Sequence, residues 1–205
     1  MFFRILRDFV GVLVFILNGN AHYQQREKLP QNESYILIAP HRSWIDPIYL
    51  ALGAKPKDFA FMAKKELFKN PIFGWIIRKA NAFPVDRLNP GPSAIKTPVK
   101  ILKEGKLSLV MFPTGTRHSA ELKGGAPTIA KLSGVPMVPA VYQGPLTFKD
   151  LLKRKKIVVR FGDPIYVDRK TRLTKESLAV IEKDVQAAFD QLDREIDPTY
   201  RYEYK

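Results

Sequence analysis

The sequence contains no cysteine, and this absence removes several kinds of chemistry at once. Without thiols the chain can form no disulfide, no thiolate metal site and no cysteine nucleophile. Histidine is also scarce, and the three histidines, His22, His41 and His118, do not fall at a metal-ligand spacing. No G-x-S-x-G nucleophile elbow, Walker loop or dinucleotide-binding G-x-G-x-x-G is present either. We therefore expect neither a metal nor another cofactor.

Long apolar runs are equally rare, and the one notable run lies near the N-terminus. Phe9–Leu17 contains no polar side chain, but Arg4, Arg7 and Asp8 interrupt the apolar residues before it. A spanning helix needs about 20 mostly apolar residues, and no small-residue cleavage site of a signal peptide follows the run. We expect a helix that enters one membrane leaflet without crossing it, with its charged residues at the lipid headgroups. The alternative is a helix buried in the protein core.

Acidic residues are too few to balance the basic ones, which leaves a formal net charge of +14. Such an excess is typical of proteins with an anionic partner, which can be a nucleic acid, an acidic membrane or a phosphorylated substrate. A generally basic, soluble surface is the simpler explanation. Because no nucleic-acid-binding module or aromatic stacking motif accompanies the charge, we expect no nucleic-acid partner.

The remaining sequence alternates strand-like apolar runs with helical patterns. Strands are predicted at Tyr35–Ala39, Asp58–Met62, Ala82–Val85, Leu107–Phe112, Met137–Tyr142 and Ile157–Phe161. Helices are predicted at Ser43–Leu52, Asn70–Lys79, Ser93–Glu104, Thr128–Leu132 and Thr174–Ile196. In a chain of 205 residues, this alternation predicts a single α/β domain with a central, mostly parallel sheet flanked by helices. We place an N-terminal membrane-associating helical segment at residues 1–30 and the α/β domain at residues 31–205.

A histidine and an aspartate follow the first predicted strand, in the segment APHRSWIDP. Loops after strand ends commonly carry the sites of α/β proteins. His41 and Asp46 would diverge by about 140° within one helix, so they can meet only if His41 lies in the loop and Asp46 in the first helical turn, with Ser43 as the N-cap. The carboxylate would then orient the imidazole and stabilise its charged form. The alternative is structural, because Ser43-x-x-Asp46 resembles a capping box and Asp46-Pro47 a helix start.

A second candidate site follows the strand Leu107–Phe112, in the segment FPTGTRHS. Gly115 lets backbone amides approach an anion. Thr114 and Thr116 offer hydroxyl donors, and Arg117 offers a guanidinium fork. The segment is therefore either a phosphate cradle or a strand-to-loop turn with an incidental arginine.

Further basic residues lie outside these two segments. Arg87, at the end of FPVDR, is either a phosphate ligand or the partner of Asp86 in a surface ion pair. A basic cluster spans Lys149–Lys156, and other basic residues are Lys64, Lys65, Lys69, Arg78 and Lys79. These side chains either face anionic lipid, where each contributes about 1 kcal/mol, or form a solvated surface.

Taken in order, four segments resemble the motifs of the glycerophospholipid acyltransferase family, most closely those of bacterial members that acylate 1-acyl-glycerol 3-phosphate. His41–Asp46 matches the H-x-x-x-x-D motif, and Lys64–Arg87 resembles the second block, which ends in a substrate-binding arginine. Phe112–Arg117 resembles F-P-E-G-T-R, and Gly134–Ala140 matches the proline-containing fourth block. Each motif alone is weak, whereas four in order at family-like spacing form a specific signal over residues 35–164.

The resemblance implies that an acyl chain moves from a thioester, on acyl carrier protein or coenzyme A, to lysophosphatidic acid. His41 would act as general base on the acceptor hydroxyl and Asp46 would orient it, so no covalent acyl-enzyme is needed. Phosphate binding would fall to Arg87, Gly115, Thr116 and Arg117. The protein would work at the cytoplasmic face of the cell membrane, as a peripheral or monotopic protein bound to the phospholipid bilayer.

One residue departs from the family pattern, because Thr114 stands where the family usually has glutamate. If Thr114 helps to bind the acceptor, it does so through a hydroxyl without charge, which also removes repulsion against a phosphate. Two alternatives therefore stay open. One is acyl transfer to another acceptor, such as glycerol 3-phosphate or a lysophospholipid with a larger head group. The other is a catalytically silent lipid-binding protein.

Overall fold

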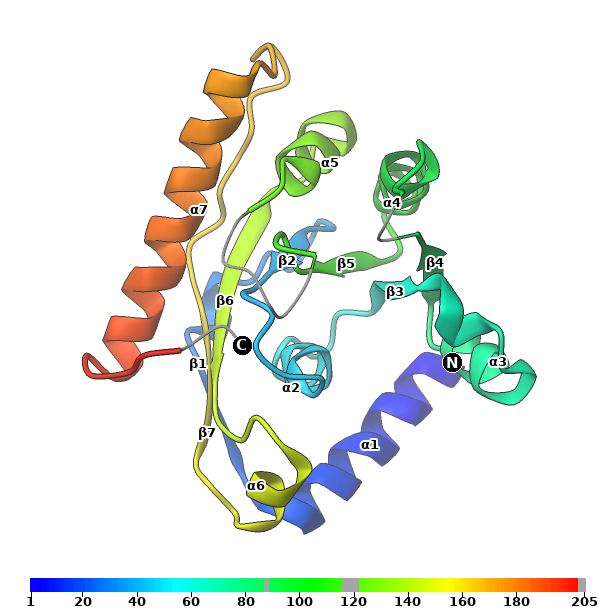
Figure 1. Cartoon of the computed structure of the whole chain (residues 1–205), viewed down its shortest axis with the longest axis vertical. Helices are drawn as coiled ribbons and strands as arrows, with labels where there is room; N and C mark the ends of the chain where they lie inside the picture. Colours follow the sequence, from blue (N-terminus) through cyan, green and yellow to red (C-terminus); the bar gives the residue numbers. More distant parts are fainter. Residues whose placement is uncertain (87–88, 116–121, 203–205) are drawn as a thin grey trace.

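Seven strands form one sheet in the order β1-β7-β6-β2-β5-β3-β4 in the computed structural model, which describes residues 1–86, 89–115 and 122–202 (Figure 1). The strands are β1 (Ala21–Gln24), β2 (Ile36–Ile38), β3 (Phe59–Lys64), β4 (Ala82–Val85), β5 (Ser108–Met111), β6 (Met137–Gln143) and β7 (Ile157–Phe161). The strands from β6 to β4 run parallel, β7 pairs antiparallel with β6, and β1 pairs parallel with β7. The predicted α/β class and mostly parallel sheet are confirmed.

Helices cover both faces of this sheet. They are α1 (Phe2–Asn18), α2 (Asp46–Gly53), α3 (Pro71–Lys79), α4 (Ser93–Lys103), α5 (Gly125–Ser133), α6 (Phe148–Leu152) and α7 (Lys175–Ile196), with two 3-10 turns, η1 (Arg26–Lys28) and η2 (Lys65–Phe68). Leu37 of β2 faces a core shared with α1 and α2, whereas Ile36 and Ile38 face a second core shared with α4, α5 and α7. All three β2 residues are fully buried, as expected of a parallel strand covered on both faces.

The helix predicted at Ser43–Leu52 begins later than expected. Its first residue is Asp46 and its N-cap position is Ile45, so the prediction of Ser43 as the cap is wrong. The Ser43 hydroxyl instead donates a hydrogen bond to the carbonyl of Leu146, 3.1 Å away. The sequence predicts neither β1 nor α6, because the β1 residues AHYQ form no apolar run and the five residues of α6 are too few to show a helical period.

The N-terminal segment forms α1, a helix with one buried and one exposed apolar face. Phe3 and Val14 are buried against the body of the protein. The exposed apolar side chains of the helix include Ile5, Phe9, Val12, Leu13, Phe15 and Ile16. The alternative prediction, a helix buried in the protein core, therefore holds for one face of α1 and not for the other. None of the helices built from the described residues combines the length and apolar composition that crossing a bilayer requires.

The three charged residues of α1 bind the body of the protein. Arg4 pairs with Asp58 at 2.8 Å, and Asp8 pairs with Lys55 at 2.7 Å. The Arg7 side chain is only 8% exposed. These contacts fasten α1 to the segment between α2 and β3. The Arg4 and Asp8 side chains are still 64% and 58% exposed, so their place at the lipid headgroups stays a prediction.

Candidate active site

The candidate site lies at the edge of the sheet where β2 and β5 end. These strands are parallel neighbours, and Ile38 of β2 is in register with Met111 of β5. The two following loops therefore leave the sheet at the same edge, where α/β proteins commonly bind ligands. The first loop carries His41, and the second begins with Phe112. The first and third predicted motifs thus meet in space although they are far apart in the sequence.

The predicted histidine and aspartate are in contact. His41 Nδ1 lies 3.3 Å from Asp46 Oδ2, with His41 in the loop and Asp46 as the first residue of α2. Both residues are buried, and none of the Asp46 surface is exposed. When Nδ1 carries the proton, the imidazole donates to the carboxylate and Nε2 is left to accept a proton. This is the geometry that a general base requires.

Two backbone amides hold the Asp46 carboxylate in place. The N–H groups of Arg42 and Ser43 donate to Asp46 Oδ2 at 2.7 and 2.8 Å. The same oxygen faces His41, so the loop backbone and the imidazole converge on one atom. Asp46 therefore starts a helix and orients a histidine, which joins the two interpretations that the sequence left open.

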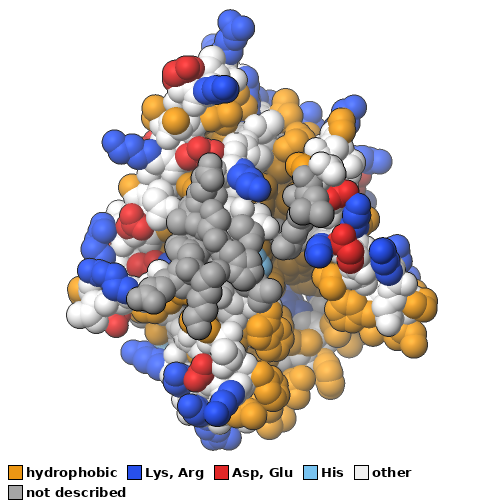
Figure 2. All heavy atoms as spheres, in the orientation of Figure 1, with side chains coloured by type: hydrophobic (Ala, Val, Ile, Leu, Met, Phe, Trp, Pro, Cys, Tyr) orange, Lys and Arg blue, Asp and Glu red, His pale blue; other side chains and the backbone are white. Residues whose placement is uncertain are grey.

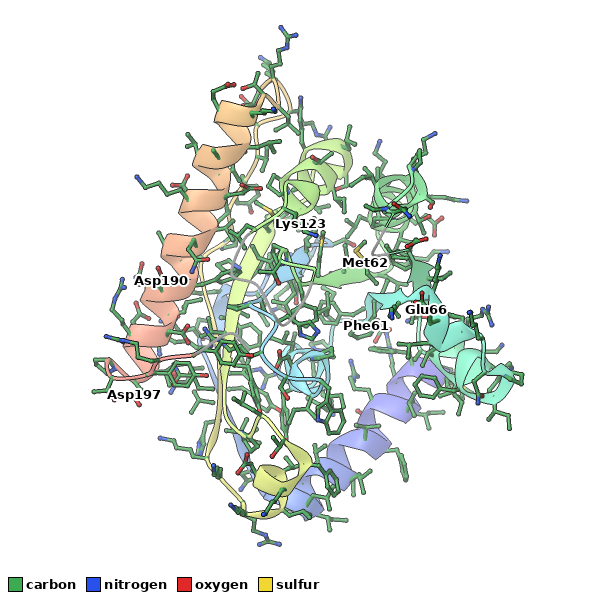
Figure 3. All side chains as sticks on the ribbon, viewed as in Figure 1. Phe61, Met62, Glu66, Lys123, Asp190 and Asp197 are labelled. Atoms are coloured by element: carbon green, nitrogen blue, oxygen red, sulfur yellow. The ribbon has the colours of Figure 1, made fainter. Side chains whose placement is uncertain are left out.

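A cavity of about 320 Å³ opens on one side of His41, and we call it the Lys123 cavity. Lys123 lines it from the loop before α5, and Met62 lines it from β3 (Figure 3). Gly115 also lines it and has a φ of 68°, a left-handed conformation that favours glycine. A Cβ atom on Gly115 would lie 3.9 Å from Lys123 Nζ, so the ammonium lies over the glycine turn.

His41 also lines a second cavity of about 510 Å³, which we call the apolar groove. Its walls come from α1, α2, β3, η2 and α3, and its apolar lining includes Phe3, Val10, Ile48, Phe61, Leu67 and Ile77. Both cavities are lined by His41, Met62, Val110 and Phe112. His41 therefore lies where a cavity that carries a lysine meets an apolar groove.

An ion pair lies at the rim of the Lys123 cavity. The Asp86 carboxylate accepts a hydrogen bond from Lys65, and this bond raises the pKa of the Lys65 ammonium. The pairing offsets a negative charge that would otherwise repel an anionic ligand in the cavity. The sequence suggested Arg87 as a partner of Asp86, and Arg87 lies outside the described residues.

The structure places only some of the predicted phosphate ligands. Gly115 lines the Lys123 cavity. Thr114 is 1% exposed and is not among the described residues that line either cavity, so its contribution to substrate binding stays a prediction. The other three predicted ligands, Arg87, Thr116 and Arg117, lie outside the described residues, and their roles also stay predictions.

Sequence reasoning missed two basic residues near the His41–Asp46 pair, namely Lys123 and Arg42. Lys123 lies in a stretch without a recognised motif, so no local signal marked it. Arg42 lies inside the H-x-x-x-x-D motif, and its partner is Asp193 of α7. Proximity to His41 could have marked Arg42, but a contact between such distant positions leaves no local pattern. Within the part of the chain that the structure describes, no group of three histidine or acidic side chains is arranged to hold a metal.

The family is settled by comparison with known proteins. A protein-family model described as Acyltransferase matches residues 20–143, which make up well over half of the chain and contain the His–Asp pair. The chain belongs to the acyltransferase family.

Two curated relatives are each named 1-acyl-sn-glycerol-3-phosphate acyltransferase. The relative from Streptococcus pneumoniae is 49% identical over 196 residues, which cover 95% of this chain and 74% of the relative. The relative from Bacillus subtilis is 40% identical over 188 residues, which cover 90% of this chain and 94% of the relative. The crystal structure of the 1-acyl-sn-glycerophosphate (LPA) acyltransferase PlsC from Thermotoga maritima has the same fold. Its TM-score is 0.70 at 22% identity, over 97% of this chain and 81% of that one.

Proposed function

We propose that this acyltransferase moves an acyl chain from an acyl thioester to the sn-2 hydroxyl of 1-acyl-sn-glycerol 3-phosphate, forming phosphatidic acid. The observation that carries the proposal is the position of His41 at the junction of the Lys123 cavity and the apolar groove. An acceptor with one phosphate and one acyl chain matches these two environments. The names of the two bacterial relatives support the same acceptor.

The contacts of His41 support general-base catalysis. Because Nδ1 faces Asp46, Nε2 would take the proton of the acceptor hydroxyl while the hydroxyl oxygen attacks the thioester carbonyl carbon. The C–O ester bond forms, the C–S bond breaks, and the proton passes to the leaving thiolate. A positioned general base contributes about 10²- to 10⁴-fold to the rate of such a reaction. The scheme contains no covalent acyl-enzyme.

The two cavities suggest where the substrate groups bind. The phosphate would lie in the Lys123 cavity, close to the Gly115 turn that leads to the predicted ligands Thr116 and Arg117. A lysine binds phosphate as a point charge, whereas an arginine adds a planar fork, so the two residue types complement each other. An acyl chain would lie in the apolar groove, where each buried methylene contributes about 0.8 kcal/mol.

The exposed apolar surface supports membrane docking through α1, and we propose that the docking takes place at the cytoplasmic face of the cell membrane. Hydrophobic side chains gather over α1 and α3 (Figure 2), and the rings of Phe2 and Trp75 join the two helices at 5.7 Å. Arg78 and Lys79 lie in the last turn of α3, next to this surface. Apolar side chains beside cations suit an anionic lipid surface. A soluble donor, acyl carrier protein or coenzyme A thioester, would reach the site from the same side of the membrane.

The test is to incubate the purified protein with lysophosphatidic acid and each thioester, and to identify the products by mass spectrometry. We expect phosphatidic acid from the wild type and none from His41→Ala. Product from glycerol 3-phosphate or a larger lysophospholipid, but not from lysophosphatidic acid, would replace the proposed acceptor. No product from any acceptor, together with lipid binding, would identify a catalytically silent lipid-binding protein.

A further inference from the structure

The catalytic loop, residues 40–45, is tied to the C-terminal part of the chain through Arg42. The Arg42 guanidinium pairs with the Asp193 carboxylate through two parallel contacts, of which Nη1 to Oδ1 measures 2.9 Å. Nη1 also donates to the carbonyl of Tyr142 at 3.1 Å. Only 6% of the Arg42 side chain and 14% of the Asp193 side chain are exposed. A pair at this depth must have good geometry to offset its desolvation, and the parallel fork supplies it.

Residues around this ion pair restrict it further. Gln143 of β6 donates to Asp193 Oδ1 at 2.9 Å and so fixes the carboxylate. The rings of Tyr200 and Tyr202, from the segment after α7, lie 5.2 and 5.6 Å from Arg42 Cζ. Both distances are within the range of cation–π attraction. Burial raises the pKa of Tyr200, so its ring stays neutral beside the guanidinium.

One peptide unit connects this cluster to the His–Asp pair. The Tyr202 hydroxyl donates to the carbonyl oxygen of Arg42 at 3.0 Å. The N–H of the same peptide unit belongs to Ser43, and it donates to Asp46 Oδ2 at 2.8 Å. Because a peptide unit is planar and rigid, fixing its carbonyl also fixes the direction of its N–H. The plane is thus held at one end by Tyr202 and at the other by Asp46.

We propose that Asp193 and Tyr202 are positioning residues for acyl transfer, and that with Tyr200 they form a C-terminal clamp on the catalytic loop. The clamp fixes the peptide between Arg42 and Ser43, the peptide fixes the carboxylate, and the carboxylate fixes the imidazole. Small displacements matter here, because a shift of about 1 Å in a reacting group can lower a rate about 100-fold. The kinetic part of this inference rests on the proposed function, whereas the order of the loop can be measured without any activity.

A purely structural role is the competing explanation, and α7 offers a matched control for it. Glu195 lies on the same helix and pairs with Arg160 of β7 at 2.7 Å. This ion pair also fastens α7 to the sheet, but it does not touch the catalytic loop. Loss of the Glu195 pair should therefore reproduce any effect that comes from loosening α7 alone.

The kinetic test compares three full-length variants. Tyr202→Phe keeps the ring and removes the hydroxyl, and we expect kcat to fall about 3- to 10-fold, the equivalent of one net hydrogen bond. Asp193→Asn should lower kcat about 10- to 100-fold. The KM for either substrate should change less than about two-fold in both, because the clamp does not touch substrate. Glu195→Gln should leave kcat and KM within about two-fold of the wild-type values.

Two further measurements separate positioning from stability. Amide hydrogen exchange at Ser43 should accelerate in Tyr202→Phe and not in Glu195→Gln. In an Asp46→Ala background, Tyr202→Phe should cause no further loss of kcat, because its effect passes through Asp46. Unchanged exchange at Ser43, an undiminished effect in that background, or an equal loss in Glu195→Gln would overturn the clamp. A wild type that fails to acylate lysophosphatidic acid would overturn the proposed function instead, and the exchange measurement would still decide the clamp.

Discussion

The imidazole of His41 stacks on the phenyl ring of Phe112, with ring centroids 4.1 Å apart and planes inclined by 23°. The stack restricts the plane of the imidazole, and the contact with the Asp46 carboxylate turns Nδ1 toward Asp46. Together the two contacts set the direction of Nε2, the nitrogen that would take the proton. The orientation of the proposed base therefore depends on Phe112, in the loop after β5, and on Asp46, the first residue of α2.

Because His41, Asp46 and Phe112 contribute differently to the proposed base, we expect their substitutions to lower turnover by different amounts. His41→Ala should abolish turnover and leave the fold intact, because Met62, Val110 and Phe112, the other described residues that line both cavities, have no group that can take the proton. Asp46→Asn should lower kcat severely, within the range of about 10²- to 10⁴-fold that general bases contribute. Phe112→Leu keeps an apolar neighbour but no ring, so it should have a smaller effect. Steady-state kinetics and circular dichroism provide the test, and near-normal turnover of His41→Ala would exclude the proposed mechanism.

Lys123 should govern affinity for the phosphorylated acceptor. Lys123→Ala removes the ammonium over the Gly115 turn, and loss of a contact to a charged group is worth about 10- to 100-fold in affinity. We expect a rise in the KM for lysophosphatidic acid and little change in the KM for the thioester. Lys123→Arg, which keeps the charge, should recover part of the loss. Arg87→Ala and Arg117→Ala should weaken use of the same acceptor.

The control for this prediction is Lys131→Ala, which removes a cation in the last turn of α5, away from the described lining of both cavities. It should leave both KM values unchanged. If Lys123→Ala and Lys131→Ala affected the acceptor equally, general surface charge, and not a specific contact, would account for acceptor affinity.

The regular elements could be predicted because their signals are local. Ala82–Val85 and Ile157–Phe161 are strands with the predicted bounds. The long C-terminal helix begins after Thr174, whose side chain caps it as part of a capping box. The site could be predicted only in part. The position of His41 after a strand is a local signal, but the pairing of Arg42 with Asp193 exists only after folding, so no window of sequence contains it.

Buried tyrosines predict a loss of stability at alkaline pH. Burial raises the pKa of Tyr49 to about 12, and it also raises the pKa values of Tyr23, Tyr35 and Tyr142. The unfolded value is about 10, so the unfolded chain releases these protons first as pH rises. Their contribution to stability is therefore complete below about pH 10 and is lost as pH rises from there through the folded-state values.

Phenolate absorbance and circular dichroism, followed in one titration, test this prediction. A first group of tyrosines should ionise while the fold is intact, and a second group should ionise only as the protein unfolds. Ionisation of every tyrosine before any loss of ellipticity would show that burial does not suppress the phenolate form.

The exposed face of α1 should bind anionic vesicles. Deleting α1 would be a poor test, because Phe3 and Val14 would leave the core with it. Phe9 and Ile16 are 66% and 61% exposed, so Phe9→Glu with Ile16→Glu changes the outer face and spares the buried one. We expect this variant to lose most flotation with vesicles and to lose activity on bilayer-embedded lipid more than on dispersed short-chain lipid. Residual binding through the basic side chains should disappear at high salt.

Tryptophan fluorescence can show which helix reaches the lipid. Trp44 and Trp75 are the two tryptophans of the chain, so in Trp44→Phe the emission reports on α3 alone. Trp75 is 54% exposed and contacts Phe2 of α1, so an α1 that lies on the membrane should bring Trp75 to the interface and shift its emission to the blue. A cysteine introduced at position 2 should react with an impermeant thiol reagent only from the side that holds the catalytic domain. Labelling from the opposite side would show a helix that crosses the membrane. Unchanged Trp75 emission together with no flotation would show that the apolar face of α1 does not bind lipid.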